Sequence, residues 1–417
     1  MDDSMKPETP EPQTGNGISR RGWLGVSAAA ALSLAIAPNR LHAEDVASDL
    51  ANTDLGDELA QLMSLASVPG VAVANVKGKS VDATGYGMTR AETGKPVNAD
   101  TVFEAASLSK PVFAYLVHLL ALEGKIDLDR PLREYLALPN PSDARAATIT
   151  ASHVLSHTSG WRNWRFGKDD VLTADFDPGA RFSYSGEGYY FLQRVVEKIT
   201  GKGILRITRE RIFEPLGMTR TSYMWAPEFD TSRAEPHSGR GIPIDSFNAA
   251  LGKSMRDAAK AEAANIDDWK HEDFERTFAA ANKERPPFPN FLAPNVAGSM
   301  HTTAGDYGKF LAHIMSAGTS AMPGKRILDR MMTPKVEIKS MLKWGLGFGL
   351  ETGEIGGSAK PLFWHWGDNN GFKNIVIGDP AASSAIVVLT NSNNGRTIYE
   401  RVVRRVRGKD QPAFLWI

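Results

Sequence analysis

Apolar and polar positions alternate with changing periods along the chain, and the first change comes near residue 67. Between residues 50 and 66, leucines recur three to five positions apart, a spacing that predicts an amphipathic helix. Pro69 and Gly70 end this pattern, and the runs VAVANV and KSVDATGYG then predict two strands joined by a turn at Lys77–Gly78. The N-terminal part of the pattern therefore predicts a helix followed by a β-hairpin.

Two later segments predict helices of different kinds. From Val112 to Leu122 the chain is apolar almost all round, which is typical of a buried helix, and Gly124 ends it. The run EGYYFLQRVVEKIT has apolar residues four positions apart and is followed by Gly201, a common helix stop. One helix is thus expected inside the fold and the other partly at its surface.

The middle and the last third of the chain differ in pattern. The pattern of residues 131–290 predicts mostly helix and loop, and residues 225–290 are charged and alanine-rich, which suggests an insertion that covers one side of a site. Short β-rich runs follow, WGLGFGLE, GFKNIVIGDP and SSAIVVLTN, the last two joined by a turn around Asp379–Pro380. A terminal helix, RTIYERVVRRV, ends the pattern.

Strands at both ends of the pattern enclose a helical middle. This order predicts an α+β fold, with one antiparallel sheet built from both ends of the chain and flanked by helices. The sheet part is expected at residues 44–130 and 291–417, and the mostly helical part at 131–290, with its insertion at 225–290.

Residues 1–43 have the features of a leader with an export signal. Residues 1–17 are polar and proline-rich, and ISRRGWLGVSAAAALSLAIAPNRLHAED then combines Arg20 and Arg21 with an apolar stretch and a small residue, Ala43. Serine followed by two arginines resembles a twin-arginine signal. The alternative is a membrane anchor, but the apolar stretch is shorter than the ~20 residues that a span needs. Cleavage after Ala43 would give a periplasmic or secreted protein without a membrane anchor.

Composition excludes several classes of function. Lysine plus arginine and aspartate plus glutamate both number 48, so no net field attracts nucleic acid. The chain has no cysteine, which removes disulfides, thiolate ligands and cysteine nucleophiles. Its nine histidines show no HExxH or similar spacing, so neither a metal nor another cofactor is predicted. No feature predicts an oligomeric state.

The candidate nucleophile lies at the head of the apolar helix, in Ser107-Leu108-Ser109-Lys110. Positions three apart share one helix face, so the lysine amine can reach the Ser107 hydroxyl, and a partly buried amine can be the neutral base that a serine needs. Such pairs also occur by chance, as in Ser340-Met-Leu-Lys343, which precedes a strand. The alternative for Ser107 is an ordinary first-turn serine.

Two further segments carry candidate chemistry. FSYSGEGYY places Tyr184 before a helix, where a tyrosine beside a lysine can be a phenolate or share its proton. FWHWGDNNGF places His365 and Gly367 at the start of a strand, whose edge can hydrogen-bond a substrate. A core tyrosine and a turn histidine are the alternatives, and a second His-x-Gly at His237 shows how common that pattern is.

Together and in this order, the three segments resemble the serine β-lactamase and penicillin-binding protein superfamily, in its class C β-lactamase-like branch. That branch includes D-alanyl-D-alanine carboxypeptidases, D-aminopeptidases and carboxylesterases. The resemblance runs from about Val68 to Asn391 and includes VLSHTSGW, IFEPLGMTRTS and GSMHTTAGDYGKFL.

The resemblance implies Ser107 as the acylated nucleophile, with Lys110 and Tyr184 as its proton-transfer partners. His365 would be the first residue of the family's Lys-Thr-Gly or His-x-Gly motif. The oxyanion hole would be the backbone N–H of Ser107 and that of Asp368, the residue after Gly367. Two such donors commonly contribute a few kcal/mol each.

The chain departs from the family pattern at two positions. Gly186 stands where β-lactamases and peptidases of the family carry the asparagine of Tyr-x-Asn, and it has no amide for an acylamino carbonyl. His365 replaces a lysine, which weakens the positive charge offered to a substrate carboxylate. Trp161, Trp164 and Trp366 could form an aromatic acyl pocket, or they could be packing residues.

The sequence therefore predicts an exported serine hydrolase that forms an acyl-enzyme with a small ester or amide substrate and prefers esters. A D-amino-acid peptidase or a weak β-lactamase is the alternative within enzymes. A non-catalytic cell-wall-binding protein of the same fold is the alternative of another class.

Overall fold

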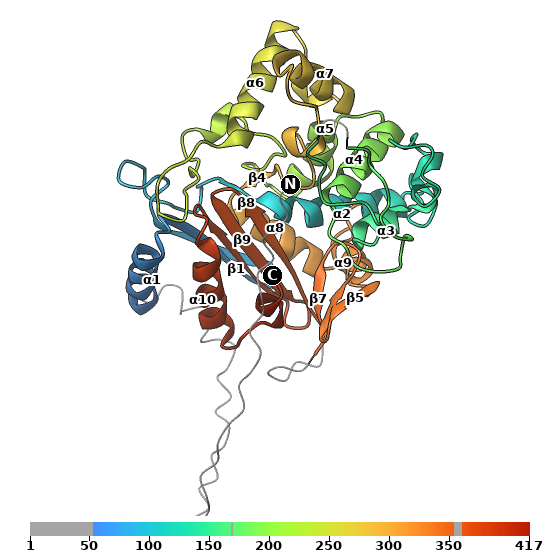
Figure 1. Cartoon of the computed structure of the whole chain (residues 1–417). Coiled ribbons are helices and arrows are strands. Elements are labelled where there is room, and N and C mark those ends of the chain that lie inside the picture. Colours follow the sequence, from blue (N-terminus) through green and yellow to red (C-terminus); the bar gives the residue numbers. More distant parts are fainter. Residues whose placement is uncertain (1–52, 168–169, 354–360) are drawn as a thin grey trace, which may run out of the picture. The chain divides into compact units, whose positions relative to one another are not determined.

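The computed structural model describes residues 53–167, 170–353 and 361–417, and Figure 1 gives their arrangement. The predicted leader and twin-arginine signal at 1–43 lie outside the described residues. Within the described ranges, no helix combines the length and hydropathy needed to cross a membrane.

The main sheet has eight strands in the order β2-β1-β10-β9-β8-β7-β6-β5, and every neighbouring pair is antiparallel. Strand β1 pairs with β10 from Val71 opposite Thr390 to Lys77 opposite Ser384, so both ends of the described chain build one sheet, as predicted. The strands are β1 (Gly70–Lys77), β2 (Ser80–Gly87), β5 (Val336–Lys339), β6 (Leu342–Trp344), β7 (Gly349–Glu351), β8 (Leu362–Asn369), β9 (Phe372–Asp379) and β10 (Ser384–Thr390).

A two-stranded sheet lies beside the main one and leads into the candidate nucleophile. It pairs β3 (Phe103–Glu104) with β4 (His301–Thr302) in antiparallel register.

The predicted hairpin near residue 78 is present, with Gly78 at a φ of 57° that glycine adopts easily. The second Ser-x-x-Lys lies in the β5–β6 hairpin, where Ser340 is exposed in the turn and Lys343 is in β6.

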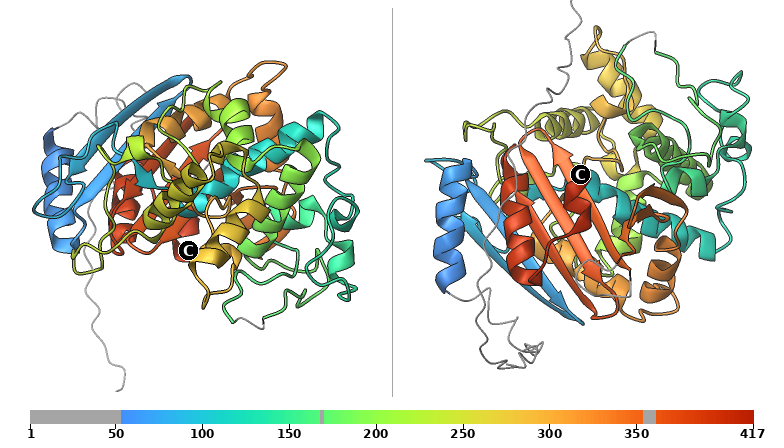
Figure 2. Two further views of the ribbon diagram at one scale, coloured as in Figure 1. Left: turned by 90° about the horizontal axis from the view of Figure 1, so that it is seen from above. Right: turned by 60° about the horizontal axis from the view of Figure 1, so that its bottom comes forward.

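Helices cover both faces of the main sheet. On one face, α1 (Thr53–Ala66) and α10 (Gly395–Arg407) pack against Val71 and Val73, whereas Ala72 and Ala74 belong to the core on the other face. That second face carries α2 (Ser109–Leu122), α8 (Ala304–Met315) and α9 (Gly324–Met331). Figure 2 shows α1 and α10 side by side on the sheet.

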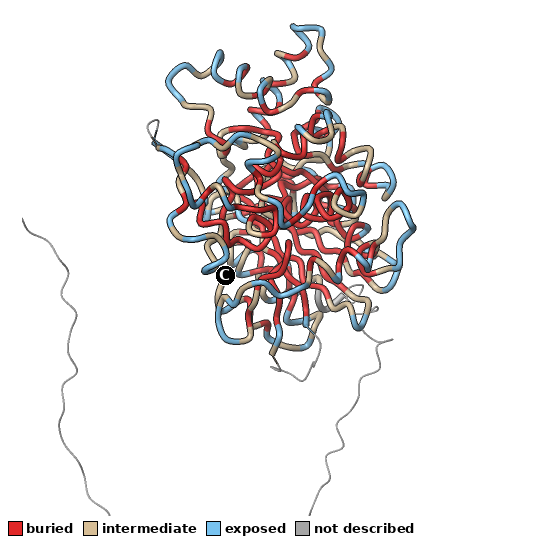
Figure 3. Tube along the Cα trace, turned by 90° about the vertical axis from the view of Figure 1, so that its right-hand side faces the viewer, coloured by how far each residue is buried: buried red, intermediate tan, exposed pale blue. Residues whose placement is uncertain are grey.

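The predicted buried helix is α2. Its residues from Ser109 to Leu120 are all buried, and Gly124 follows it at a φ of 71°. Figure 3 shows buried residues gathered in the interior of the trace, with exposed ones at its periphery. Because the first turn of α2 is itself buried, Lys110 lies inside the protein.

The described residues between 131 and 290 form helices and turns. The predicted helix near residue 190 is α4, which ends at Gly201 with a φ of 71°. The remaining helices are α3 (Ala151–Leu155), α4 (Gly186–Thr200), α5 (Ile204–Thr208), α6 (Phe247–Ala261) and α7 (His271–Ala281). Short helical turns are η2 (Ala106–Leu108), η3 (Leu132–Glu134), η4 (Ala146–Thr148), η5 (Arg209–Phe213), η6 (Pro227–Phe229), η7 (Ile266–Asp268), η8 (Pro289–Phe291) and η9 (Pro412–Leu415).

Candidate active site

Ser107 lies in the 3₁₀ turn that connects β3 to α2. The preceding residue, Ala106, has a φ of 51°, a left-handed conformation that is costly for a residue with a Cβ. Ser109 fixes the turn, because its hydroxyl donates to the Ala106 carbonyl at 2.5 Å and accepts from the Met300 N–H at 3.1 Å. Ser109 is thus a structural serine, while Ser107 stays partly exposed.

Lys110 is buried and points its amine at Ser107. Its Nζ lies 3.1 Å from the Ser107 Oγ and donates to the Ala297 carbonyl at 2.6 Å. No ion pair joins it to a carboxylate in the part of the chain that the structure describes. Burial without a counter-charge lowers the pKa of Lys110 well below its ordinary value, which favours the neutral amine.

Tyr184 lies over the same amine. The Lys110 Nζ is 4.7 Å from the centroid of the Tyr184 ring. The Tyr184 hydroxyl is buried and makes no hydrogen bond of standard geometry with the described residues. Burial raises the pKa of Tyr184 above its ordinary value, and the nearby Ser107 hydroxyl only partly opposes this rise. The neutral phenol is therefore favoured, and the phenolate that the sequence left open is not.

His157, from the segment VLSHTSGW, completes the wall behind Tyr184. The two rings stack with centroids 4.1 Å apart, and the His157 Nδ1 accepts from the Ser185 N–H at 3.1 Å. Burial, followed by the positive charge of Lys110, lowers the pKa of His157 well below its ordinary value. The sequence gives no signal for this role, because His157 belongs to a segment that carries only the family resemblance.

His365 lies in the middle of β8, so the prediction that it stands at the start of a strand was wrong. The strand begins at Leu362, because the three residues before His365 are apolar and buried in the core. The His365 Nδ1–H donates to the Trp366 carbonyl at 2.7 Å, and the side chain is fully buried. Burial, with the Lys110 charge as the second cause, lowers the pKa of His365 to about 3. The ring is therefore neutral at physiological pH.

Gly367 brings β8 against the nucleophile segment. A Cβ on this residue would lie 2.3 Å from the Ala105 carbonyl oxygen, so only glycine fits without a backbone shift. Strand β7 pairs with β8 only as far as Trp364, and among the described residues no strand pairs with the stretch from His365 to Asn369 on that side. This is a local open edge in the middle of the sheet, where a substrate could lie alongside.

Asp368 follows Gly367 on this open stretch. Its side chain is exposed and forms an ion pair with Lys373. The role expected from the resemblance belongs to its backbone N–H, and that role stays a prediction.

The space beside Gly186 is filled by an aromatic ring. A Cβ on Gly186 would lie 2.3 to 2.7 Å from three ring atoms of Trp164, so this tryptophan occupies the place of a larger residue. Trp161, in contrast, is fully buried and packs edge-to-face on Phe191 with centroids 5.2 Å apart. Of the two roles that the sequence left open for Trp161, its position fits packing, since the loop turns it into the core and presents Trp164 beside Gly186. A substrate-binding role for Trp161 stays a prediction.

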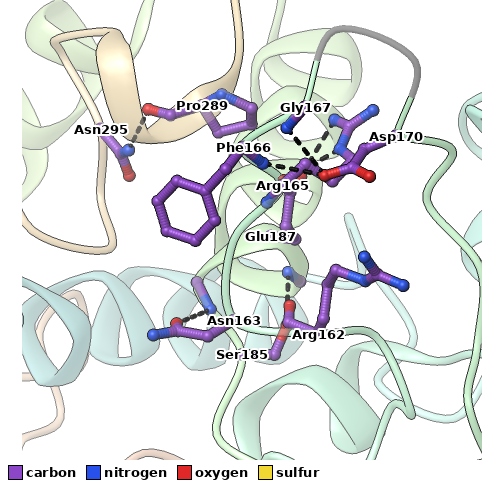
Figure 4. A network of polar contacts seen from close by, with 12 residues as sticks. Arg162, Asn163, Arg165, Phe166, Gly167, Asp170, Ser185, Glu187, Pro289 and Asn295 are labelled. Carbon is purple, nitrogen blue, oxygen red and sulfur yellow. Dashed lines mark hydrogen bonds and ion pairs between the residues drawn. The ribbon is translucent and has the colours of Figure 1, made fainter. Parts of the chain in front are cut away.

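Polar contacts hold the Trp164 loop against the start of α4, as Figure 4 shows. The Asn163 Oδ1 accepts from the Gly186 N–H at 2.8 Å. Arg165 makes a two-pronged ion pair with the buried Glu187, at 2.9 and 3.1 Å. The Ser185 hydroxyl donates to the Arg162 carbonyl at 3.0 Å. Neither Ser185 nor Glu187 is thus free to replace the amide that Gly186 lacks.

The second His-x-Gly has a structural role. The buried His237 places Nδ1 2.9 Å from the Asn391 carbonyl and accepts the Ala91 N–H on Nε2 at 3.1 Å. Within the described ranges, no group of three His, Asp or Glu side chains could hold a metal ion.

Comparison with known proteins places this geometry in context. A profile of the family described as Beta-lactamase matches residues 56–407. Esterase EstB of Burkholderia gladioli is 28% identical over 42% of this chain and 52% of its own length. Penicillin-binding protein 4 of Amycolatopsis lactamdurans is 32% identical over 39% of this chain and 46% of its own length. The matched parts thus span about half of these curated relatives.

Solved structures share the fold at low sequence identity. The D-alanine carboxypeptidase AmpC of Burkholderia cenocepacia has a TM-score of 0.64 at 20% identity, over 88% of this chain and 99% of its own. A class C β-lactamase has a TM-score of 0.65 at 18% identity, over 86% of this chain and 96% of its own. The predicted α+β fold is confirmed by this likeness and by the eight-stranded antiparallel sheet.

Proposed function

Because the chain belongs to the β-lactamase family, we propose that it is a serine hydrolase that forms an acyl-enzyme at Ser107. The observation that carries this proposal is the buried Lys110 amine, 3.1 Å from the Ser107 Oγ and without a carboxylate partner in the described chain. An amine kept neutral by burial can accept the serine proton when the hydroxyl attacks a carbonyl.

In the proposed reaction, the Ser107 Oγ forms a bond to the carbonyl carbon while its proton passes to Lys110. Negative charge on the carbonyl oxygen would be stabilised by the N–H groups of Ser107 and Asp368. The ester or amide bond then breaks, and the leaving group takes a proton from the pair formed by Lys110 and Tyr184. Water repeats the sequence on the acyl-enzyme and releases the acid.

We further propose small esters as preferred substrates over β-lactams. Trp164 fills the position where an asparagine amide would bind an acylamino carbonyl, and the neutral His365 offers no positive charge to a substrate carboxylate. The similarity to Esterase EstB favours the same preference. A D-amino-acid peptidase remains the second candidate, supported by the fold shared with a D-alanine carboxypeptidase.

Export by the twin-arginine route, with cleavage after Ala43, is proposed on the leader sequence alone. The active protein would then be periplasmic or secreted.

The test is a substrate panel of p-nitrophenyl acetate, D-alanyl p-nitroanilide and nitrocefin on the wild type and on Ser107→Ala. We expect the ester to exceed nitrocefin in kcat/KM by about 100-fold or more, since each lost charged or amide contact costs roughly 1.5–3 kcal/mol. Intact mass after a fluorophosphonate should show an adduct on the wild type only. An adduct on the variant would exclude Ser107 as the nucleophile, and absence of both turnover and labelling in the wild type would favour the non-catalytic alternative.

A further inference from the structure

A cavity of about 250 Å³ is lined by residues that neighbour the motif segments in sequence or in space. Its lining includes Gly298, next to the Ala297 carbonyl that holds Lys110, and Asn369, which follows Asp368 on β8. Trp164 lines another side, beside Gly186. The cavity is therefore next to the position of a bound substrate, and the family motifs assign it no ligand.

Glu104 is a buried acid in this lining, three residues before the nucleophile. Its side chain is only 4% exposed, and its oxygens accept from the Ser246 hydroxyl, from the Asn248 Nδ2 at 2.6 Å and from the Asn369 Nδ2 at 3.2 Å. All three groups donate to the oxygens of Glu104, which is the pattern expected for an ionised carboxylate. The contacts also join the start of α6, in the 225–290 segment, to β3 and β8.

Among the described residues that line the cavity, no positive charge balances this carboxylate. The described residues that line the cavity include Glu104 and Asp245 but no Lys, Arg or His. The nearby Arg165 is already paired with Glu187. Burial lowers the pKa of His301, behind Glu104 in β4; Glu104 acts in the opposite direction, and the charge of Arg233, which pairs with Asp230 at 3.6 Å, adds to the lowering. His301 is therefore neutral as well.

The cavity also presents an acceptor without a donor. The Asn290 Oδ1 is buried and has no hydrogen-bond partner among the described residues, and Asn290 lines the cavity. A buried acceptor left unpaired costs free energy, and so does a buried charge without a counter-charge. An ammonium group, with a positive charge and several N–H donors, would satisfy both.

We propose that this cavity binds an ammonium group of the substrate through Glu104, so that the enzyme prefers cationic esters or amides to neutral and anionic ones. The inference rests on the proposed hydrolase function and narrows its substrate class. A site built for a substrate carboxylate would favour anionic substrates, whereas the proposed site favours cationic ones. The neutral His365 agrees with this preference, because it offers no positive charge to a carboxylate.

The test compares esters of matched shape that differ in charge, with each kcat/KM divided by the rate of hydroxide-catalysed hydrolysis of the same ester, so that the inductive effect of the ammonium group is removed. Acetylcholine is paired with 3,3-dimethylbutyl acetate, and the p-nitrobenzyl ester of glycine with that of propionate, so that the charge lies in the leaving part or in the acyl part. In at least one pair we expect the cationic ester to have a kcat/KM about tenfold or more above its neutral partner. Glu104→Gln should bring this ratio close to one.

Two variants control for structure. Ser246→Ala removes one hydrogen bond to Glu104 and keeps the charge, so the ratio should persist. Asp245→Asn removes a charge from an exposed position on the cavity, so the ratio should fall less than in Glu104→Gln because water screens that charge.

A wild-type ratio near one in both pairs would overturn the inference. So would an equal loss on both members of a pair in Glu104→Gln, which would mean that the residue is only structural. Phosphonate probes give the same ratios without turnover, from the rate at which they label Ser107. Cholinyl and dimethylbutyl leaving groups match the first pair, and aminomethyl and ethyl groups on phosphorus match the second. Labelling at equal rates within both probe pairs therefore refutes the charge preference alone, whereas no labelling at all refutes the proposed function and this inference with it.

Discussion

Lys110 lies in an environment that penalises its charged form. Its neighbours are the Ser107 hydroxyl, the Ala297 carbonyl and the ring of Tyr184, and none of them is a carboxylate. In the unfolded chain the same amine has its ordinary pKa of 10.5. Between the lowered folded pKa and that value, the unfolded state binds one proton more than the folded state. The stability of the wild type therefore rises with pH across this window and falls as the pH is lowered through it.

Lys110→Met tests this environment. We expect ester turnover to fall by about 10²–10⁴-fold, the usual contribution of a general base. In the variant, the part of the rise in unfolding free energy with pH that Lys110 causes should disappear. The unfolding free energy of the wild type should therefore increase relative to that of the variant as the pH approaches 10.5. Urea unfolding at several pH values measures it, with Ser107→Ala as the inactive control that keeps the amine. Parallel pH profiles for the wild type and the methionine variant would contradict a lowered pKa.

At the scale of elements, the Trp164 loop and the start of α4 fit together as one unit. Asn163 and Arg165 bind the first turn of α4 on either side of the tryptophan, and Gly186 leaves room for its ring. The ring of Trp164, from a neighbouring loop, thus fills the space that the side chain of the family's asparagine would take at position 186. Reintroducing the asparagine alone should therefore not restore lactam recognition.

Gly186→Asn should destabilise the protein by about 1–3 kcal/mol, because the new side chain meets the Trp164 ring. Trp164→Ala combined with Gly186→Asn should recover part of this loss and raise nitrocefin turnover relative to p-nitrophenyl acetate. Thermal unfolding and the two assays measure both effects, with Trp164→Ala alone as the control. An unchanged melting temperature in Gly186→Asn would show that the ring gives way at little cost.

At the scale of the whole molecule, the sheet forms only when distant parts of the chain are present. Strand β1 pairs with β10 across more than 300 residues, so β1 has only β2 as a partner until the C-terminal part of the chain is made. The proposed leader, residues 1–43, lies outside the described residues, and export tests it directly.

Arg20→Lys combined with Arg21→Lys should keep the uncleaved precursor in the cytoplasm, because the twin-arginine pair defines the proposed signal. Arg40→Lys is the matched control, since it makes the same change in the same leader outside the pair. Cell fractionation and the mass of the exported protein, expected to begin at Glu44, provide the measurement. Normal export of the double variant would point to another route.

The sequence by itself determined the helices that carry Lys110 and follow Tyr184, and the order of the site's motifs, but not where the strand of His365 begins. The apolar run from Val112 predicted a buried helix, and glycines at 124 and 201 ended helices where they were expected. These features could be predicted because periodicity and helix stops act over a few residues. The antiparallel sheet built from both ends also followed from the placement of strands along the chain.

Only the tertiary structure decided which side chains meet at the site. The sequence could not separate Trp161 from Trp164, because a loop turns one into the core and the other toward Gly186. The neutral states of Lys110 and His365, and the unbalanced charge of Glu104, likewise depend on burial and on groups far away in the sequence. The free energy of a charge is set by everything packed around it, and that packing exists only once the chain has folded.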